Sequence, residues 1–184
     1  GWRPTKAVRG LLAMIMIDLD KFKPVNDIYG HAAGDAILHQ VSARFCSCVN
    51  DTGLTARLGG DEFVIIVSDM SRAQVAKLCD EIIDVINQPF DLQGIEVFIG
   101  VSLGIAIAPT DAENISDLLR YADIALYKAK NSGRNKYEFY HHELGAKIVQ
   151  RREMELELRE AIFSGQLSVV YQPRYDVSQA KITA

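Results

Sequence analysis

The chain has little cysteine, no apolar run of membrane length and no excess of basic charge. Its three cysteines are odd in number, lack metal-ligand spacing and lie in helix-like stretches, so we expect reduced thiols at Cys46, Cys48 and Cys79. No uninterrupted apolar run reaches the roughly 20 residues that a membrane helix needs, and no signal peptide is recognisable. A formal net charge of -4 argues against a general binder of nucleic acid or of anionic membranes. We therefore expect a cytoplasmic module without nucleic-acid or membrane contacts, although a longer protein could be membrane-anchored elsewhere.

What is present is enough apolar sequence for one sizeable core, 48% of 184 residues. The patterns predict strands at 11–18, 95–108 and 137–140, a hairpin at 54–68, and helices near 21–28, 33–49, 71–87 and 115–132. This order predicts an α/β (α+β) chain in which helices pack on the faces of a central sheet.

The sequence RLGGDEF at residues 57–63 lies between an alternating run and a strand-like run. Two glycines in that position predict a tight hairpin, because short hairpins need positive φ values that glycine adopts without a steric penalty. Asp61 and Glu62 would then lie at the hairpin tip, beside a backbone that a ligand can approach closely. Such a ligand should be cationic or carried on a cation. The alternative is a solvated acidic turn.

A second acidic site follows the unbroken apolar run of residues 11–17, which fits a strand buried on both faces of a sheet. Asp18 then emerges at the carboxyl end of a central strand, where α/β sheets often bind ligands. Asp18 could instead be solvated or cap the following helix. Together with the acidic hairpin tip it predicts an oxygen-rich site for Mg²⁺ or Mn²⁺, which usually bind one or two carboxylates plus substrate phosphates.

Several sequence blocks together resemble the GGDEF family, the diguanylate cyclases. They cover roughly residues 8–141 in the order of the family, namely IDLDKFK at 17–23, ND at 26–27, GHAAGD at 30–35, RLGGDEF at 57–63, SLGIA at 102–106 and ADIALYKAKNSGRN at 122–135. The resemblance implies a domain over residues 1–141 with a central mixed, mainly antiparallel sheet flanked by helices, as in nucleotide cyclases and polymerase palms.

The resemblance also implies an activity, the condensation of two GTP molecules into cyclic di-GMP with release of pyrophosphate. Each 3′-hydroxyl attacks the α-phosphorus of the other nucleotide, so catalysis needs a homodimer with one GTP in each site. Two Mg²⁺ or Mn²⁺ ions per active site, about 3.5–4 Å apart, would stabilise the attacking and leaving oxygens.

By position, the resemblance assigns metal binding to Asp18, the carbonyl of Leu19 and Asp61, and catalysis to Asp61 with Glu62. Asn26 and Asp35 would bind guanine, since an ionised Asp only accepts hydrogen bonds and suits the N1–H and N2–H₂ edge. The β- and γ-phosphates would be neutralised by cationic side chains, and further residues complete the substrate set: Lys23, Lys130 and Arg134, then Phe22, His31, Gly59 and Gly60.

Each role has a structural alternative. Lys130 and Arg134 follow a helix whose dipole favours basic residues regardless of a ligand. Asn26 could be a turn residue, Asp35 a first-turn helix acid, and His31 a hydrogen-bonded structural histidine. A GTP-binding regulatory module that tunes a neighbouring domain without catalysis also remains open. A polymerase-like or adenylate-type cyclase is disfavoured by the Asn26 and Asp35 pair.

The chain changes character after Tyr140. Residues 142–165 form a charged helix pattern that predicts a linker, and residues 166–184, with a strand-like run at 167–173, resemble the start of an EAL domain, the cyclic di-GMP phosphodiesterase that often follows GGDEF. About 19 residues cannot bury a core, so we expect no phosphodiesterase activity from them. The implied partners are this adjoining EAL domain and an N-terminal sensory domain.

Two departures from the family pattern qualify this interpretation. Residues 50–53 read NDTG where the family carries an inhibitory Arg-x-x-Asp site, so we expect no product inhibition through that site. The opening Asp-x-Leu-Thr-Gly-Leu-x-Asn-Arg segment and its helix are not found before residue 11. Its absence puts the stability and geometry of the site in question.

Overall fold

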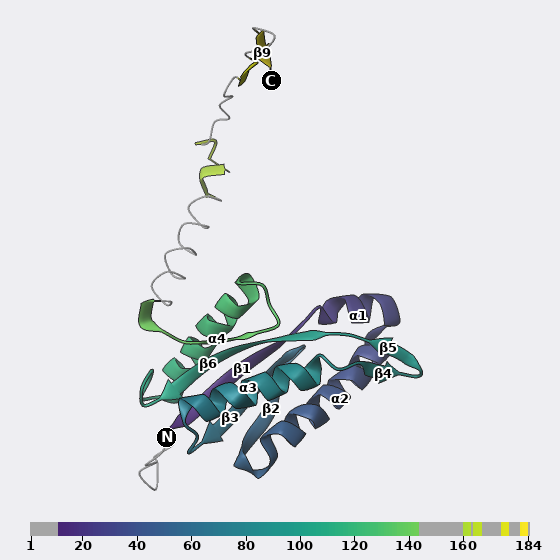
Figure 1. Cartoon of the computed structure of the whole chain (residues 1–184), viewed down its shortest axis with the longest axis vertical. Helices are drawn as coiled ribbons and strands as arrows, with labels where there is room; N and C mark the ends of the chain where they lie inside the picture. The colour runs from purple at the N-terminus through teal and green to yellow at the C-terminus, as the bar shows by residue number, and fades with distance from the viewer. Residues whose placement is uncertain (1–10, 144–159, 163, 167–173, 177–180, 184) are drawn as a thin grey trace. The chain divides into compact units, whose positions relative to one another are not determined.

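The computed structural model of the chain describes residues 11–143, 160–162, 164–166, 174–176 and 181–183 (Figure 1). The chain divides into two compact units, Gly1–Ala146 and Lys147–Ala184, which are described separately. In the second unit, β8 (Arg174–Asp176) pairs antiparallel with β9 (Lys181–Thr183), and residues 160–162 are helical. The strand expected at 167–173 and most of the linker helix expected at 142–165 lie outside the described residues. Within the described part, no helix has both the length and the apolar character to cross a membrane.

A five-stranded sheet with the order β2-β3-β1-β6-β7 forms the centre of the first unit. The middle strand, β1 (Leu12–Asp20), pairs antiparallel with β3 (Glu62–Ser68) and with β6 (Gly100–Ala108). At the edges, β2 (Gly53–Gly59) pairs antiparallel with β3, whereas β7 (Tyr137–Phe139) is parallel to β6. The expected mixed, mainly antiparallel sheet flanked by helices is therefore confirmed.

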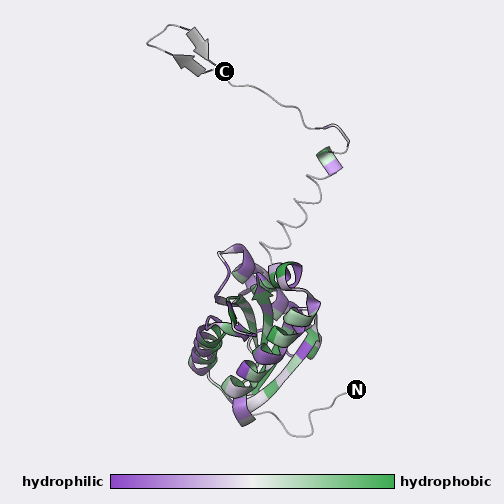
Figure 2. Cartoon of the chain, turned by 90° about the vertical axis from the view of Figure 1, so that its right-hand side faces the viewer, coloured by the Kyte–Doolittle hydropathy of each residue, from purple (hydrophilic) through white to green (hydrophobic). Residues whose placement is uncertain are grey.

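Helices cover the two faces of this sheet. On one face α1 (Phe22–Tyr29), α2 (His31–Val49) and α3 (Arg72–Ile86) contribute to the larger core, and on the other α4 (Ile115–Asn131) forms the smaller one (Figures 1 and 2). Alternation along β1 serves both cores, because Ile15 and Ile17 face the first and Met14 and Met16 the second. β1 is thus buried on both faces, as its unbroken apolar run predicts.

The packing of α4 on β6 depends on one glycine. A Cβ atom on Gly104 would lie 2.1 Å from the carbonyl oxygen of Ala122 and 2.1 Å from the backbone nitrogen of Leu126. Only a residue without a side chain permits this close approach of helix and strand. The position of α4 matters for function because its carboxyl end carries Lys130, and Arg134 follows it.

The boundaries of several elements differ from those expected. β1 continues to Asp20, so Asp18 lies inside the strand and not at its carboxyl end, where it was expected. The hairpin turn consists of Gly60 and Asp61, while Gly59 still belongs to β2. The expected strand region 95–108 is divided into β5 (Ile95–Val97) and β6, and β5 forms a short hairpin with β4 (Phe90–Leu92), which precedes that region. The ladder passes through Asp18 and Asp20 because backbone pairing is independent of side-chain polarity, whereas the sequence pattern is not.

Candidate active site

The acidic hairpin and the end of β1, which are far apart in sequence, lie side by side. Asp18 pairs directly with Glu62 in the register of β1 and β3. The backbone N–H of Leu19 donates a hydrogen bond of 3.2 Å to the carbonyl oxygen of Asp61. Gly60 adopts a φ of 56°, in the left-handed region that favours glycine, and so allows the tight turn at Asp61. The fold thus brings Asp18, Leu19, Asp61 and Glu62 together.

Asp18 is largely buried and lies against a cation. Its side chain is 14% exposed, and its Oδ2 atom lies 2.6 Å from the Nζ atom of Lys130. Burial raises the pKa of Asp18 above its ordinary value, the hydrogen bond and charge of Lys130 lower it, and the nearby charges of Asp61 and Asp20 raise it further. Lys130 therefore stabilises the ionised form of this largely buried carboxylate.

Asp20, two residues further along β1, holds the turn that follows α4. Ser102 Oγ donates to both carboxylate oxygens at 3.0 and 2.9 Å, and the backbone N–H of Asn135 donates at 2.9 Å. Arg134 and Asn135 both have positive φ, and the Nε atom of Arg134 lies 3.7 Å from Asp20 Oδ1. One buried carboxylate thereby fixes the segment that carries Arg134.

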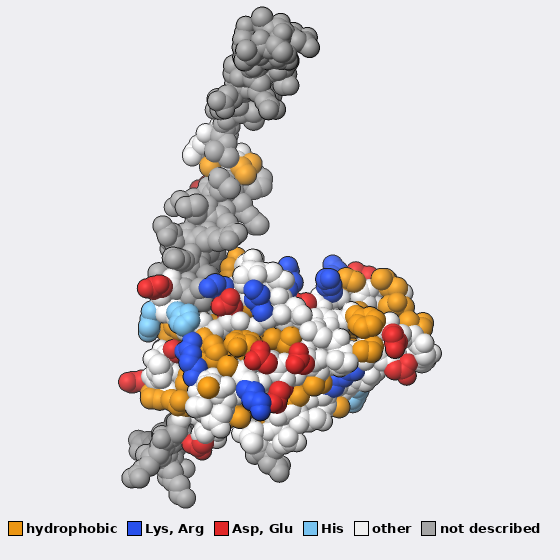
Figure 3. Space-filling view, in the orientation of Figure 1, with side chains coloured by type: hydrophobic (Ala, Val, Ile, Leu, Met, Phe, Trp, Pro, Cys, Tyr) orange, Lys and Arg blue, Asp and Glu red, His pale blue; other side chains and the backbone are white. Residues whose placement is uncertain are grey.

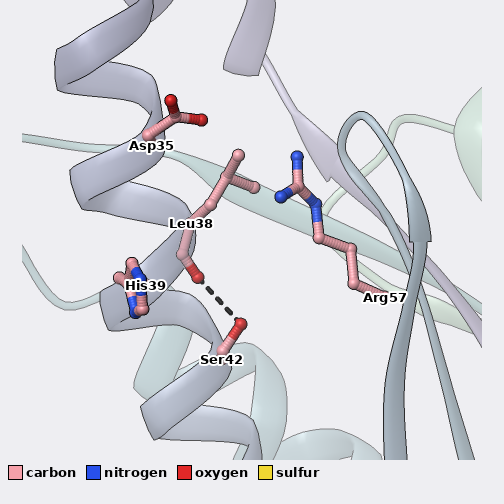
Figure 4. A pocket seen from close by; sticks show the side chains of 5 residues that line it. All are labelled: Asp35, Leu38, His39, Ser42 and Arg57. Atoms are coloured by element: carbon pink, nitrogen blue, oxygen red, sulfur yellow. Dashed lines mark hydrogen bonds between the residues drawn. The ribbon is translucent and has the colours of Figure 1, made fainter.

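A cavity of about 360 Å³ lies between α2 and β2 (Figure 4). One wall is a helical stripe of α2, formed by Asp35, Leu38, His39 and Ser42, and Arg57 of β2 forms the other. Nε of Arg57 donates a hydrogen bond of 3.0 Å to the carbonyl oxygen of Gly60, which ties this side chain to the hairpin turn. Asp35, expected to bind guanine, therefore lines a real hollow.

The other residues of the predicted substrate set occupy α1 and the start of α2. Asn26 is packed against Gly34, where an added Cβ would lie 1.9 Å from Asn26 Oδ1, so Asn26 is close to Asp35 although it does not line the cavity. Lys23 and His31 are exposed. The side chain of Phe22 is buried in the core, so this residue can offer a ligand its backbone but not its ring. The substrate-binding role of Phe22 stays a prediction, and it would fall to the backbone of this residue.

The donor atoms at the end of β1 fit a hard divalent cation. Within the described residues, no three His, Cys, Asp or Glu side chains gather closely enough to hold a metal ion. Asp18, the carbonyl of Leu19 and Asp61 offer only oxygen, the donor that Mg²⁺ and Mn²⁺ prefer. Mg²⁺ commonly completes such a set with substrate phosphates. The residues present therefore fit a metal that binds together with a phosphorylated substrate.

An arginine of α2, Arg44, lies close to residues 50–53, the segment expected to lack an inhibitory arginine. Arg44 lines a second cavity, of about 570 Å³, together with Asn50 and Glu81. Its guanidinium donates to the carbonyl oxygens of Val85, Gln88 and Pro89 at 2.7, 2.8 and 2.6 Å and lies 3.7 Å from the centroid of the Phe90 ring. With these contacts, Arg44 caps the carbonyl oxygens at the carboxyl end of α3.

The sequence predicted no role for three residues that contact the site, namely Asp20, Ser102 and Arg57. Asp20 follows Asp18 at a spacing of two, which places both on the same face of β1, and this spacing is a signal that sequence reasoning could have used. The contacts of Ser102 and the direction of Arg57 depend on the tertiary fold.

Figure 3 shows basic and acidic side chains interspersed on the visible face, without a broad basic patch.

The comparisons with known proteins agree on one family. Residues 2–136 match the family described as "Diguanylate cyclase, GGDEF domain". The chain is 39% identical over 162 residues to the bifunctional diguanylate cyclase/cyclic di-GMP phosphodiesterase MucR of Pseudomonas aeruginosa, covering 88% of this chain and 24% of that protein. It is 34% identical over 163 residues to the cyclic di-GMP phosphodiesterase PdeR of Escherichia coli, covering 89% and 25%.

A solved structure gives the same result. The active GGEEF domain of a diguanylate cyclase from Vibrio cholerae superposes with a TM-score of 0.66 at 33% identity, over 73% of this chain and 85% of that one. The chain spans about a fifth of the length of the curated relatives it matches, 22% and 20% in two cases.

Proposed function

The chain belongs to the GGDEF family, and on that premise we propose that it is a diguanylate cyclase, which condenses two GTP molecules into cyclic di-GMP and pyrophosphate. The observation that carries the proposal is the hydrogen bond between Leu19 and Asp61, because it joins the two acidic segments into one oxygen-rich site. A purely structural turn would not need the largely buried carboxylate of Asp18 beside it.

In the proposed reaction, the 3′-oxygen of one GTP forms a bond to the α-phosphorus of the other, and the bond from that phosphorus to the pyrophosphate oxygen breaks. Asp18, the carbonyl of Leu19 and Asp61 would hold two Mg²⁺ or Mn²⁺ ions, which supply charge stabilisation for the attacking and leaving oxygens. The Asp61 carboxylate accepts the proton of the 3′-hydroxyl, and Glu62 supports the same centre. Asn26 and Asp35 bind the guanine edge.

In the proposed complex, the triphosphate would form ion pairs with two cations that are paired with carboxylates in the structure. Lys130 is paired with Asp18, and Arg134 lies within 3.7 Å of Asp20. A bound metal ion would replace Lys130 as the counter-charge of Asp18, and Lys130 and Arg134 would then neutralise phosphate oxygens, with Lys23 contributing from α1. Gly59 and Gly60 leave the backbone of the turn open to the nucleotide.

The reaction requires two copies of the domain, since each site binds one GTP and each hydroxyl attacks the nucleotide of the other. We further propose that residues 142–165 connect the domain to an EAL domain that begins at residues 166–184, and that a sensory domain precedes it. The substrate GTP implies a cytoplasmic location for this domain. Without a complete EAL domain, these residues should not hydrolyse cyclic di-GMP.

A second candidate is a GTP-binding module that regulates an EAL phosphodiesterase without catalysis. It is favoured by the 34% identity to PdeR, which is named a phosphodiesterase. Asp18, Asp61 and Glu62 favour the cyclase, because a module that only binds nucleotide does not need the full set of metal-binding and catalytic carboxylates.

The test is incubation of the chain at high concentration with GTP and Mg²⁺ or Mn²⁺, with the products identified by mass spectrometry. Cyclic di-GMP and pyrophosphate from the parent and from Asp123→Ala, but not from Asp61→Ala, support the cyclase, since Asp123 is an exposed acid of α4 outside the site. Nucleotide binding without product, also at concentrations where the chain is dimeric, supports the regulatory module.

A further inference from the structure

The guanidinium of Arg57 is held in place by one hydrogen bond and keeps further donors for a ligand. Its Nε–H donates to the carbonyl oxygen of Gly60, and within the described residues its two terminal NH₂ groups have no hydrogen-bond or ion-pair partner. Figure 4 shows these groups pointing from β2 into the cavity, toward α2. An arginine presented in this way offers a planar fork of donors to whatever enters the cavity.

The opposite wall offers the reverse chemistry. Asp35 is exposed on α2 and accepts hydrogen bonds but does not donate them when ionised. Buried Leu38 lies between the two polar groups in Figure 4 and gives the cavity an apolar side. Arg57 and Asp35 line the same hollow but form no ion pair with each other within the 4.0 Å limit, so the space between them is open to a ligand.

A flat ring with hydrogen-bond donors on one edge and acceptors on a neighbouring edge could bond to Asp35 with the first edge and to Arg57 with the second. Guanine has this pattern, with N1–H and N2–H₂ on one edge and the acceptors O6 and N7 on the other. An arginine fork matches O6 and N7 with two parallel hydrogen bonds. Adenine carries an amino donor in place of O6, which would oppose the arginine donors. Leu38 can pack against the face of the ring.

We propose that Arg57 is a specificity-determining residue that binds the O6 and N7 edge of the guanine whose N1 and N2 edge is bound by Asp35. This inference rests on the proposed function and adds a second contact to the base-binding site. The hydrogen bond from the same guanidinium to Gly60 links base recognition to the turn that carries Asp61. A correct base would therefore also steady the hairpin at the reacting end of the nucleotide.

Equilibrium binding of nucleotide analogues tests the proposed contact between Arg57 and guanine. The ligands are 3′-deoxy-GTP, which cannot be condensed because it lacks the attacking hydroxyl, its 7-deaza analogue without N7, and its inosine analogue without the N2 amino group. Each is titrated with Mg²⁺ into the parent chain, Arg57→Met and the surface control Arg120→Met by calorimetry. We expect the 7-deaza change to weaken binding to the parent and to Arg120→Met by about fivefold to tenfold, since a full bidentate contact is worth about 1–3 kcal/mol.

In Arg57→Met the 7-deaza penalty should vanish, because the partner of N7 is gone, while the inosine penalty that depends on Asp35 should persist. The persisting penalty also shows that the variant retains a folded base site. The inference is wrong if the parent shows no 7-deaza penalty, if Arg57→Met retains the penalty in full, or if Arg57→Met loses the inosine penalty as well. If the parent binds none of the three nucleotides, the proposed function itself fails and the inference falls with it.

Discussion

Replacing Lys130 by Met should destabilise the chain in a way that depends on pH. The substitution keeps the length and apolar stem of the side chain and removes its charge. Lys130 is the cation nearest to Asp18, at 2.6 Å, and the Asp18 side chain is 14% exposed. At neutral pH the variant must therefore fold with an ionised, largely buried carboxylate that has lost its counter-charge.

The magnitude follows from the exposure of the two partners. Hydrogen bonds to charged groups contribute about 1.5–3 kcal/mol, whereas exposed ion pairs contribute about 0.2–1 kcal/mol. Lys130 is 30% exposed and part of its interaction is screened by solvent, so we expect a loss of about 1–2 kcal/mol in the free energy of unfolding at pH 7.5. For a chain of this size that corresponds to a decrease of about 2–8 °C in Tm.

The sign of the pH dependence is fixed by the pKa of Asp18, which is raised above 3.8 in the folded chain. A raised acid pKa means that the folded state holds the proton more tightly than the unfolded state, so stability falls as the pH rises through the interval between the two values. Lys130 lowers this pKa, and its removal should extend the interval upward. The variant should thus nearly match the parent near pH 4 and fall progressively behind it toward pH 8.

The assay is urea denaturation of parent, Lys130→Met and Lys128→Met at several pH values between 4 and 8. Lys128 is a matched control on the same helix, paired with Glu138 at a longer 3.7 Å and 41% exposed, and its loss should change stability by a few tenths of a kcal/mol. A Lys130→Met loss that is constant over this pH range, or no larger than that of Lys128→Met, would refute the reasoning.

Three further substitutions and reactions probe the fold around the site. Asp20→Asn should lower the free energy of unfolding by about 2 kcal/mol, because its amide would face the donors Ser102 Oγ and Asn135 N–H; an unchanged denaturation midpoint would contradict this. Gly104→Ala should cost about 1–3 kcal/mol or more by pushing α4 away from β6, and a thermal melt equal to that of the parent would show that the helix can shift freely. A thiol reagent should modify exposed Cys46 in the native chain and buried Cys79 only on unfolding, since burial also raises the pKa of the Cys79 thiol, and mass spectrometry of early Cys79 adducts would argue against the packing of α3.

Much of the fold was predictable because its signals are local. The unbroken apolar run of β1 predicts a strand buried on both faces. The two glycines predict a tight hairpin turn, which Gly60 forms with left-handed backbone. The end of β1 was predicted too early because Asp18 and Asp20 look like the start of a loop. β4 was missed because three residues are too few to show alternation.

The site was only partly predictable because its contacts join segments that are distant in sequence. Nothing near Asp18 indicates that Lys130 lies 2.6 Å away, and Ser102 reaches Asp20 across 82 residues. These contacts depend on the antiparallel pairing of β1 with β6 and on the closeness of α4 at Gly104. Sequence blocks predicted candidate residues, but only the tertiary fold shows which of them contact one another.

The arrangement of charges at the end of β1 explains how carboxylates and the cations that we propose to bind phosphate can share one site without either being left unpaired. Asp18 and Asp20 lie on the same face of the strand, and each meets one cation from the end of α4, Lys130 or Arg134. Charges taken out of water need a partner, so these ion pairs stabilise the buried Asp20 and the largely buried Asp18. The same pairs imply that a metal ion and a triphosphate bind together in the proposed reaction. Asp18 would then have a metal ion as its counter-charge and Lys130 would pair with phosphate oxygens, so that neither side chain would be left as an unpaired charge.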